Sequence, residues 1–221
     1  MRVLYINIRK EASVKKNNDG ISKGVTLIEL ILSIVFLGVI ILAAVSFDYT
    51  SFYLFDSSRK KAAIVNERSL CLEHIAKYAS RATGDINNSG IVVDAANKWA
   101  KIRIDKNNPH TPSDYSDDKW VRYEYKNKGG NVYELDFCSD WDNGPPSGCN
   151  VTEDAITSKI VTDGTNPTPG FYKGTYVNEV VCSPFTLRYK PGNSNPMDVR
   201  KNPEVYMYDN VLFSSVSHSI N

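Results

Sequence analysis

The chain has 221 residues, with 26 Lys and Arg against 25 Asp and Glu, 42% hydrophobic residues and 11% aromatic residues. This length suits one compact domain with an appendage, and the hydrophobic content excludes a wholly disordered chain. A formal net charge of +1 gives no electrostatic argument for nucleic acid as the main partner. The charge is uneven, however, because residues 1–24 carry six basic and two acidic side chains.

A long apolar segment begins where the basic residues end. From Val25 to Phe47 the chain contains no Pro, Lys or Arg and one ionisable side chain, Glu29. As a helix this segment would be about 34 Å long, enough to cross the hydrocarbon core of a bilayer. A buried helix of a soluble protein is the alternative, but it rarely needs so long an apolar run. The positive-inside rule places the basic N-terminus in the cytoplasm and residues 48–221 on the outer side of the membrane.

A cleaved secretory signal is another interpretation of this segment. Residues 43–46, Ala-Ala-Val-Ser, fit a signal cleavage site weakly. The apolar run is long for a signal, it does not end in the Cys of a lipoprotein signal, and helical character continues past Phe47. We therefore expect the segment to be retained.

Glu29 is a carboxylate near the start of the predicted membrane helix. An ionised side chain is costly in the bilayer, so its presence indicates a functional role unless it lies shallow enough to reach the headgroups. If the chain were cut after Gly24, the new α-amino group of Val25 would lie four residues before this carboxylate. Attraction between amine and carboxylate grows as the dielectric falls, so the two groups are candidate partners within a chain or between chains.

The segment from Lys23 to Glu29, followed by the apolar helix, resembles the N-terminal signature of type IV pilins and type II secretion pseudopilins. The resemblance implies that a prepilin peptidase cuts after Gly24 and that Val25 becomes the mature, N-methylated terminus. It also implies that Glu29 helps the subunit dock into a growing filament. Many major pilins have phenylalanine where this chain has Val25, which favours a minor subunit, and the helix-bending proline of many major pilins is lacking.

The resemblance also implies a location and partners. The precursor would be a single-pass protein of the bacterial inner (cytoplasmic) membrane, with a periplasmic or otherwise extracytoplasmic C-terminal domain, and would then enter a pilus or pseudopilus. Its partners would be the prepilin peptidase, other minor and major pilins or pseudopilins, the inner-membrane assembly platform and, before assembly, the lipid bilayer. The expected organisation is a leader at 1–24, a membrane or filament-core helix at 25–47, an amphipathic continuation at 48–83 and a β-rich domain at 84–221.

One continuous helix is predicted from about Val25 to Ala82. Beyond the apolar segment, hydrophobic residues recur at helical spacing, and no Pro or Gly interrupts them before Gly84, which is typical of a C-cap. The face predicted to pack on the β-rich domain consists of Phe55, Ala62, Val65, Leu72, Ile75, Ala76, Ala79 and Ala82.

The rest of the chain predicts β-strands separated by Pro- and Gly-rich segments. Residues 120–125 and 132–137 alternate polar and apolar side chains, and Lys128-Gly129-Gly130-Asn131 joins them as a hairpin. The predicted fold class is α+β and pilin-like, with one long N-terminal helix packed on one or two antiparallel β-sheets. Further strands are predicted at 99–104, 156–161, 176–182, 185–189, 205–208 and 211–216.

The order of these elements resembles one group within the family. A helix ending at 72–82 leads into the hairpin at 121–135, and the strand Phe185–Tyr189 precedes Asn202-Pro203-Glu204-Val205 at the start of a last strand pair. This order resembles the larger minor pseudopilins of the J type and the W-type minor pilins. By analogy, the chain would join other minor pilins in a complex at the filament tip that primes assembly.

Four cysteines, Cys71, Cys138, Cys149 and Cys182, follow the membrane segment and would lie where disulfides persist. Cys138 and Cys149 bracket a loop with a Gly-Pro-Pro turn, and closing it would contribute about 3 kcal/mol. That pairing leaves Cys71 and Cys182 to join the helix to a strand. A four-cysteine zinc site is the rival, but the sequence has no Cys-x2-Cys spacing.

Asp140-Trp141-Asp142-Asn143-Gly144 is similar to part of a calcium-binding loop, with oxygen ligands on alternate residues. It lacks the distal bidentate glutamate, and Asp, Asn and Gly are also common turn residues, so calcium is a weak candidate and no other cofactor is expected.

No catalytic residue is predicted, because His74, His110 and His218 lie apart and no phosphate-binding loop, nucleophile elbow or His-x-x-x-His pair occurs. We expect a structural subunit rather than an enzyme; a permanently membrane-anchored binding or adhesion domain is the alternative function.

Overall fold

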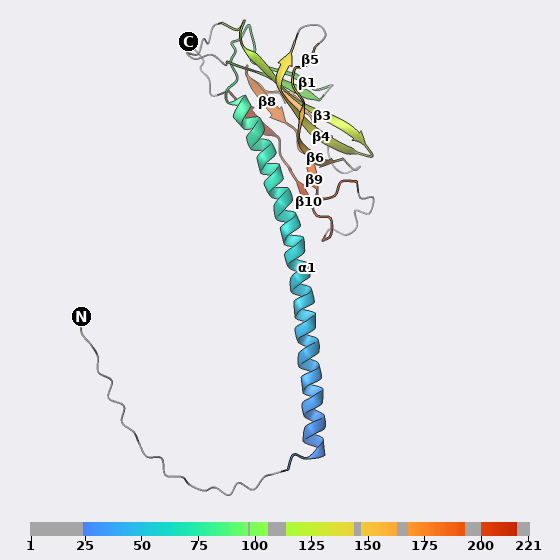
Figure 1. The fold of residues 1–221 in the computed structure, drawn as a ribbon. Helices are drawn as coiled ribbons and strands as arrows, with labels where there is room; N and C mark the ends of the chain where they lie inside the picture. Colours follow the sequence, from blue (N-terminus) through green and yellow to red (C-terminus); the bar gives the residue numbers. More distant parts are fainter. Residues whose placement is uncertain are drawn as a thin grey trace, which may run out of the picture. The chain divides into compact units, whose positions relative to one another are not determined.

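The structure is a computed structural model that describes residues 24–96, 98–105, 114–143, 147–162, 168–192 and 200–215. The chain divides into two compact units, Met1–Thr50 and Ser51–Asn221. The predicted α+β class with one long helix and antiparallel sheets is confirmed (Figure 1).

Helix α1 spans Leu27–Ala79, 53 residues, so the single continuous helix is confirmed with slightly shorter ends. Gly84 does not end it. The N–H of Ala82 donates to the carbonyl of Ala79 at 3.1 Å in a tightened last turn, and Ala82 then pairs with Ile104 in an isolated β-bridge. The helix ends here because the backbone begins to bond to the sheet before Gly84 is reached.

The helix face that packs on the sheets begins later than predicted. Phe55 is 77% exposed and Ala62 is also exposed, so these two residues were placed on the buried face wrongly. The prediction is correct for Ile75, Ala79 and Ala82, and the first buried residue of α1, Ile64, lies about two and a half turns after Phe55. The residues of α1 that are buried are Ile64, Cys71, Ile75 and Ala79.

Within the described residues the strands form two antiparallel sheets, as expected. The larger sheet has the order β1-β2-β3-β4-β6-β9-β10, with β5 beside β4, and the smaller has the order β11-β8-β7. The strands are β1 (Ile91–Asp94), β2 (Trp99–Ile104), β3 (Lys119–Gly129), β4 (Val132–Asp142), β5 (Gly148–Cys149), β6 (Asp154–Val161), β7 (Phe171–Lys173), β8 (Glu179–Cys182), β9 (Thr186–Arg188), β10 (Glu204–Tyr206) and β11 (Val211–Ser214).

The predicted hairpin is present between β3 and β4. Gly129, Gly130 and Asn131 have φ angles of 95°, 57° and 63°, in the left-handed region that a tight hairpin turn requires. The strand predicted at 176–182 begins only at Glu179. The three residues before it form a turn in which Asn178 has a φ of 62° and the Glu179 carboxylate accepts the N–H of Tyr176 at 2.9 Å.

The core lies between α1 and the inner face of the larger sheet. Alternate residues of β2, β3 and β4 point into it, and Ile102, Val121, Tyr123 and Leu135 are completely buried there. They form one hydrophobic cluster with the buried residues of α1. The opposite face of these strands carries polar and aromatic side chains.

A buried amide holds together the segment between α1 and β1. The side chain of Asn178 accepts the N–H of Gly90 at 2.5 Å and donates to the carbonyl of Gly84 at 2.9 Å. Arg103 donates to the carbonyls of Thr83 and Asn88 at 3.1 and 2.6 Å. Four backbone groups of this segment are therefore satisfied by two side chains from elsewhere in the fold.

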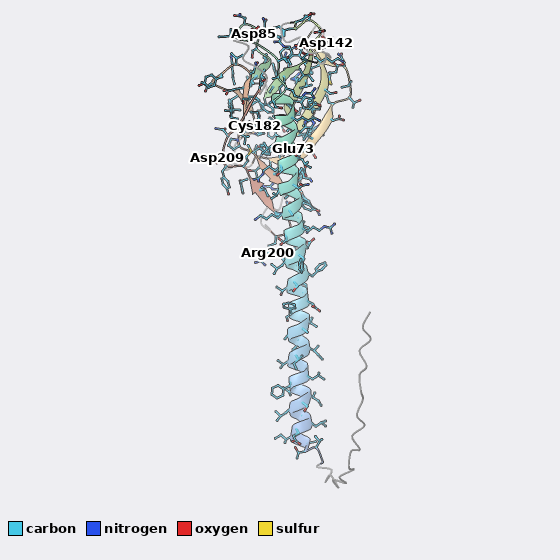
Figure 2. All side chains as sticks on the ribbon, turned by 90° about the vertical axis from the view of Figure 1, so that its left-hand side faces the viewer. Glu73, Asp85, Asp142, Cys182, Arg200 and Asp209 are labelled. Atoms are coloured by element: carbon cyan, nitrogen blue, oxygen red, sulfur yellow. A yellow bond between two sulfur atoms is a disulfide. The ribbon has the colours of Figure 1, made fainter. Side chains whose placement is uncertain are left out.

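One of the two expected disulfides is present. Cys138 and Cys149 are bonded, with Cα atoms 5.9 Å apart, and β5 pairs with the end of β4 beside them. The predicted bond between Cys71 and Cys182 is absent, and both are free, buried thiols. Figure 2 places Cys182 beside α1, where the hydroxyl of Tyr125 lies 3.1 Å from its Sγ. Burial raises the pKa of both thiols to about 12, so each remains protonated in the core.

His74 lies among aromatic side chains on the packed part of α1. Its Nδ1 is 3.0 Å from the hydroxyl of Tyr123, and its ring meets Phe137 edge-on with centroids 4.6 Å apart. Burial, and to a smaller extent the charge of Lys77, lowers the pKa of His74 below its ordinary value of 6.5. The folded protein therefore prefers the neutral imidazole.

We expect the thermal unfolding midpoint to fall as the pH is lowered below 6.5. The unfolded chain binds a proton at His74 more tightly than the folded chain, so the stability contributed by the neutral ring is present above that pH and is lost as the pH falls through the folded-state pKa. His74→Asn keeps a polar group near Tyr123 without titrating. Melting curves of the wild-type and His74→Asn proteins in detergent, at several pH values from 7 to 5, test this. The midpoint of the variant should fall less than that of the wild type, and an equal fall in the two proteins would contradict the expectation.

Candidate functional site

The first turn of α1 contains the residues on which the family resemblance depends. Val25 and Glu29 are exposed, and Gly24 has no other atoms within 4 Å of the position a Cβ would take. The remainder of the predicted leader, residues 1–23, lies outside the described part of the chain.

Thr26 and Glu29 form a reciprocal capping box. Glu29 Oε2 accepts the backbone N–H of Thr26 and its hydroxyl, both at 2.9 Å, and Thr26 Oγ1 accepts the N–H of Glu29 at 3.3 Å. Two backbone donors that have no partner within a helix are satisfied in this way. The Thr-x-x-Glu spacing ahead of an apolar run is visible in the sequence, but the role of Glu29 as a helix cap was missed.

The cap leaves part of the Glu29 carboxylate available. Both hydrogen bonds from Thr26 end on Oε2, and among the described residues none reaches Oε1. The negative charge also lies at the positive end of the helix dipole. The carboxylate is therefore held in one orientation by its own chain and can accept a further donor.

The surface of α1 around this turn is apolar and uncovered. The large hydrophobic side chains from Val25 to Phe47 are between 49% and 76% exposed. Among the described residues, α1 is the one helix long and apolar enough to span a membrane. The exposed surface continues beyond the predicted end of the segment, because Tyr49, Phe52 and Phe55 are at least 72% exposed as well. Aromatic side chains of this kind are typical of the membrane–water interface.

The sequence suggested that the weak calcium candidate lies in a loop, but the structure places its two aspartates in a strand. Asp140 and Asp142 both belong to β4, and Asp142 is at its C-terminal end (Figure 2). The carboxylate of Asp140 pairs with the ammonium of Lys119 at 3.1 Å. No group of three or more His, Cys, Asp or Glu side chains in the described ranges is arranged to hold a metal ion. Gly144 lies outside those ranges.

Comparisons of the chain with family models, with curated protein sequences and with solved structures found no match. The family resemblance therefore depends on the residues of the chain itself, chiefly those from Lys23 to Phe47.

Proposed function

We propose that the chain is a minor pilin or minor pseudopilin, a structural subunit that a prepilin peptidase processes and that then enters a type IV pilus or a type II secretion pseudopilus. The observation that carries this proposal is the position of Glu29. Its carboxylate lies in the first turn of an exposed apolar helix, five residues after the glycine at which the precursor would be cut.

Cleavage after Gly24 would change the charge of this helix end. The new α-amino group of Val25 would directly precede the capping residue Thr26, so a positive charge would appear beside the positive end of the helix dipole. That charge is unfavourable in a bilayer unless it is paired. The Glu29 carboxylate of a neighbouring subunit is a suitable partner, because the attraction increases in a low dielectric and Oε1 can accept the donor.

The apolar surface of α1 supports the same role. In the precursor it would be covered by lipid, and in the filament by the corresponding helices of other subunits. The compact unit Ser51–Asn221, which we call the β-rich unit, has a hydrophobic core and one disulfide. It would remain outside the cytoplasmic membrane. In this proposal the membrane is the bacterial inner membrane, with the basic leader on its cytoplasmic side.

A permanently anchored domain is the second candidate, and the capping box is the observation that favours it. A glutamate that caps its own helix has a structural reason to be present without any partner chain. The two candidates differ in the fate of the N-terminus. An anchored domain would keep residues 1–24 and the apolar segment, whereas the pilin proposal requires Val25 to be the first residue.

We expect the membrane form of the protein, co-expressed with a prepilin peptidase, to begin at Val25 and to carry one added methyl group. N-terminal sequencing and intact-mass analysis measure both features. Gly24→Val should block the cut, because the peptidase must accommodate a side chain where there was none. Gly20→Val places the same substitution elsewhere in the leader and should be processed normally. A chain that still begins at Met1, or one cut after Ala44, would exclude the pilin proposal.

A further inference from the structure

The outer face of the larger sheet gathers all three tryptophans of the chain. Trp99 lies on β2, Trp120 on β3 and Trp141 on β4, and each is half-buried. In the strand register, Trp120 is opposite Trp141, and Lys101 is opposite Arg122. These five residues point away from the core, since the residues next to them on β2 and β3 are buried. We call them the tryptophan face.

The two cations of the tryptophan face lie between the indole rings. The ammonium of Lys101 is 5.1 Å from the centroid of Trp99 and 5.5 Å from that of Trp120. The guanidinium of Arg122 is 5.1 Å from Trp99 and 4.0 Å from Trp141. Cation–π contacts of this kind hold the rings in place and keep both charges at one patch of the surface.

The positive charge of this patch is not fully balanced. Arg122 is paired with Glu124 at 2.9 Å, but its buried Nε has no hydrogen-bond partner in the described part of the chain. Lys101 has only a neutral acceptor, Asn143 Oδ1, at 2.6 Å, and no carboxylate of the described residues forms an ion pair with it. Partial burial, together with the charge of Arg122, lowers the pKa of Lys101. Lys101 is therefore a cation at the surface of the patch that has no carboxylate partner among the described residues.

We propose that the tryptophan face binds an acidic oligosaccharide, a short chain of sugars that carries carboxylates. The rings lie on three adjacent strands, so they cover about 10 Å across the sheet, which matches a few linked sugars rather than a single small ion. Their half-exposed surfaces offer apolar contact to the C–H faces of pyranose rings. Lys101 would take one carboxylate, with Arg122 beside it.

The charge pattern favours a sugar acid over single-stranded nucleic acid. A nucleic acid presents a phosphate at every nucleotide and is bound by a groove of several cations. The tryptophan face has one ammonium without a carboxylate partner among the described residues, and the carboxylate of Glu124, two residues after Arg122 on β3, lies beside it. A polyphosphate chain would meet repulsion there, whereas a ligand with sparse carboxylates would not.

Titration of the full chain in detergent micelles with tetragalacturonic acid tests this, with tryptophan fluorescence as the signal. We expect a saturable change, and Lys101→Gln should weaken the affinity about tenfold or more, because it removes the charge that pairs with the carboxylate. The neutral maltotetraose should bind about tenfold more weakly than the acid. Lys61→Gln removes an exposed lysine of α1 and should leave the affinity unchanged.

Trp99→Leu provides a second variant if Lys101→Gln fails to fold, and it should weaken binding of the acid because it removes one of the three ring contacts. The absence of a saturable response to tetragalacturonic acid would overturn the proposal. So would equal affinity of wild type and a folded Lys101→Gln or Trp99→Leu protein. Tighter binding of a thymidine tetranucleotide than of the sugar acid would also overturn it and would assign the face to nucleic acid instead.

Discussion

Glu29→Ala is expected to exclude the chain from filaments while leaving the cut after Gly24 intact. Without the carboxylate, the α-amino group of a neighbouring mature subunit would have no partner in a low-dielectric environment. The substitution also removes the capping box with Thr26, which costs about 1 kcal/mol at the start of the helix. Loss of incorporation by Glu29→Ala therefore does not by itself distinguish docking from capping.

Glu29→Gln separates the two roles. A glutamine at this position of a capping box still accepts the backbone N–H of Thr26, so the cap is kept while the negative charge is lost. The docking role predicts that Glu29→Gln is excluded from filaments as strongly as Glu29→Ala. Sedimentation of sheared filaments, with the mature N-terminus checked by sequencing, measures incorporation. Normal incorporation of Glu29→Gln would show that the residue acts only as a cap and that the chain enters filaments without the carboxylate charge.

Gly90→Ala is expected to destabilise the β-rich unit by about 3 kcal/mol or more, the upper part of the range for overpacked positions. An added Cβ would lie 2.1 Å from the carbonyl oxygen of Thr83 and 2.6 Å from its carbon. Both are backbone atoms, so no side chain can rotate away. Movement of Gly90 would also break its hydrogen bond to the buried side chain of Asn178.

Gly148→Ala is the matched control, because nothing lies within 4 Å of the corresponding Cβ position. It should change the free energy of unfolding by less than about 0.5 kcal/mol. Chemical unfolding of the full chain in detergent, followed by tryptophan fluorescence, reports on both variants since all three tryptophans lie in the β-rich unit. Equal stability of the Gly90→Ala and Gly148→Ala proteins would show that the close approach to Thr83 can relax.

The features that sequence alone predicted correctly are local ones. α1 was predicted because no Pro or Gly interrupts the helical pattern between Gly38 and Gly84, and the β3–β4 hairpin because two glycines and an asparagine tolerate positive φ. The Cys138–Cys149 bond was predicted because a short loop brings the two residues together. The strands β1, β5 and β7, of four, two and three residues, were missed.

The errors arose where contacts between distant segments decide the outcome. The sequence cannot show where the sheets stop covering the helix, so Phe55 was placed on the buried face although it is exposed. The pairing of Cys71 with Cys182 was inferred by elimination, whereas in the structure Tyr125 lies against the Cys182 thiol.

The sequence by itself determined the apolar segment, the predicted cleavage position and the spacing of Glu29, because each depends on residues that are contiguous in the chain. Only the tertiary structure decided the composition of the tryptophan face. Trp99, Trp120 and Trp141 are separated by about twenty residues each, and the register of β2, β3 and β4 brings them to the same surface. Long-range strand pairing is set by burial of the opposite face, which no short segment of the chain encodes.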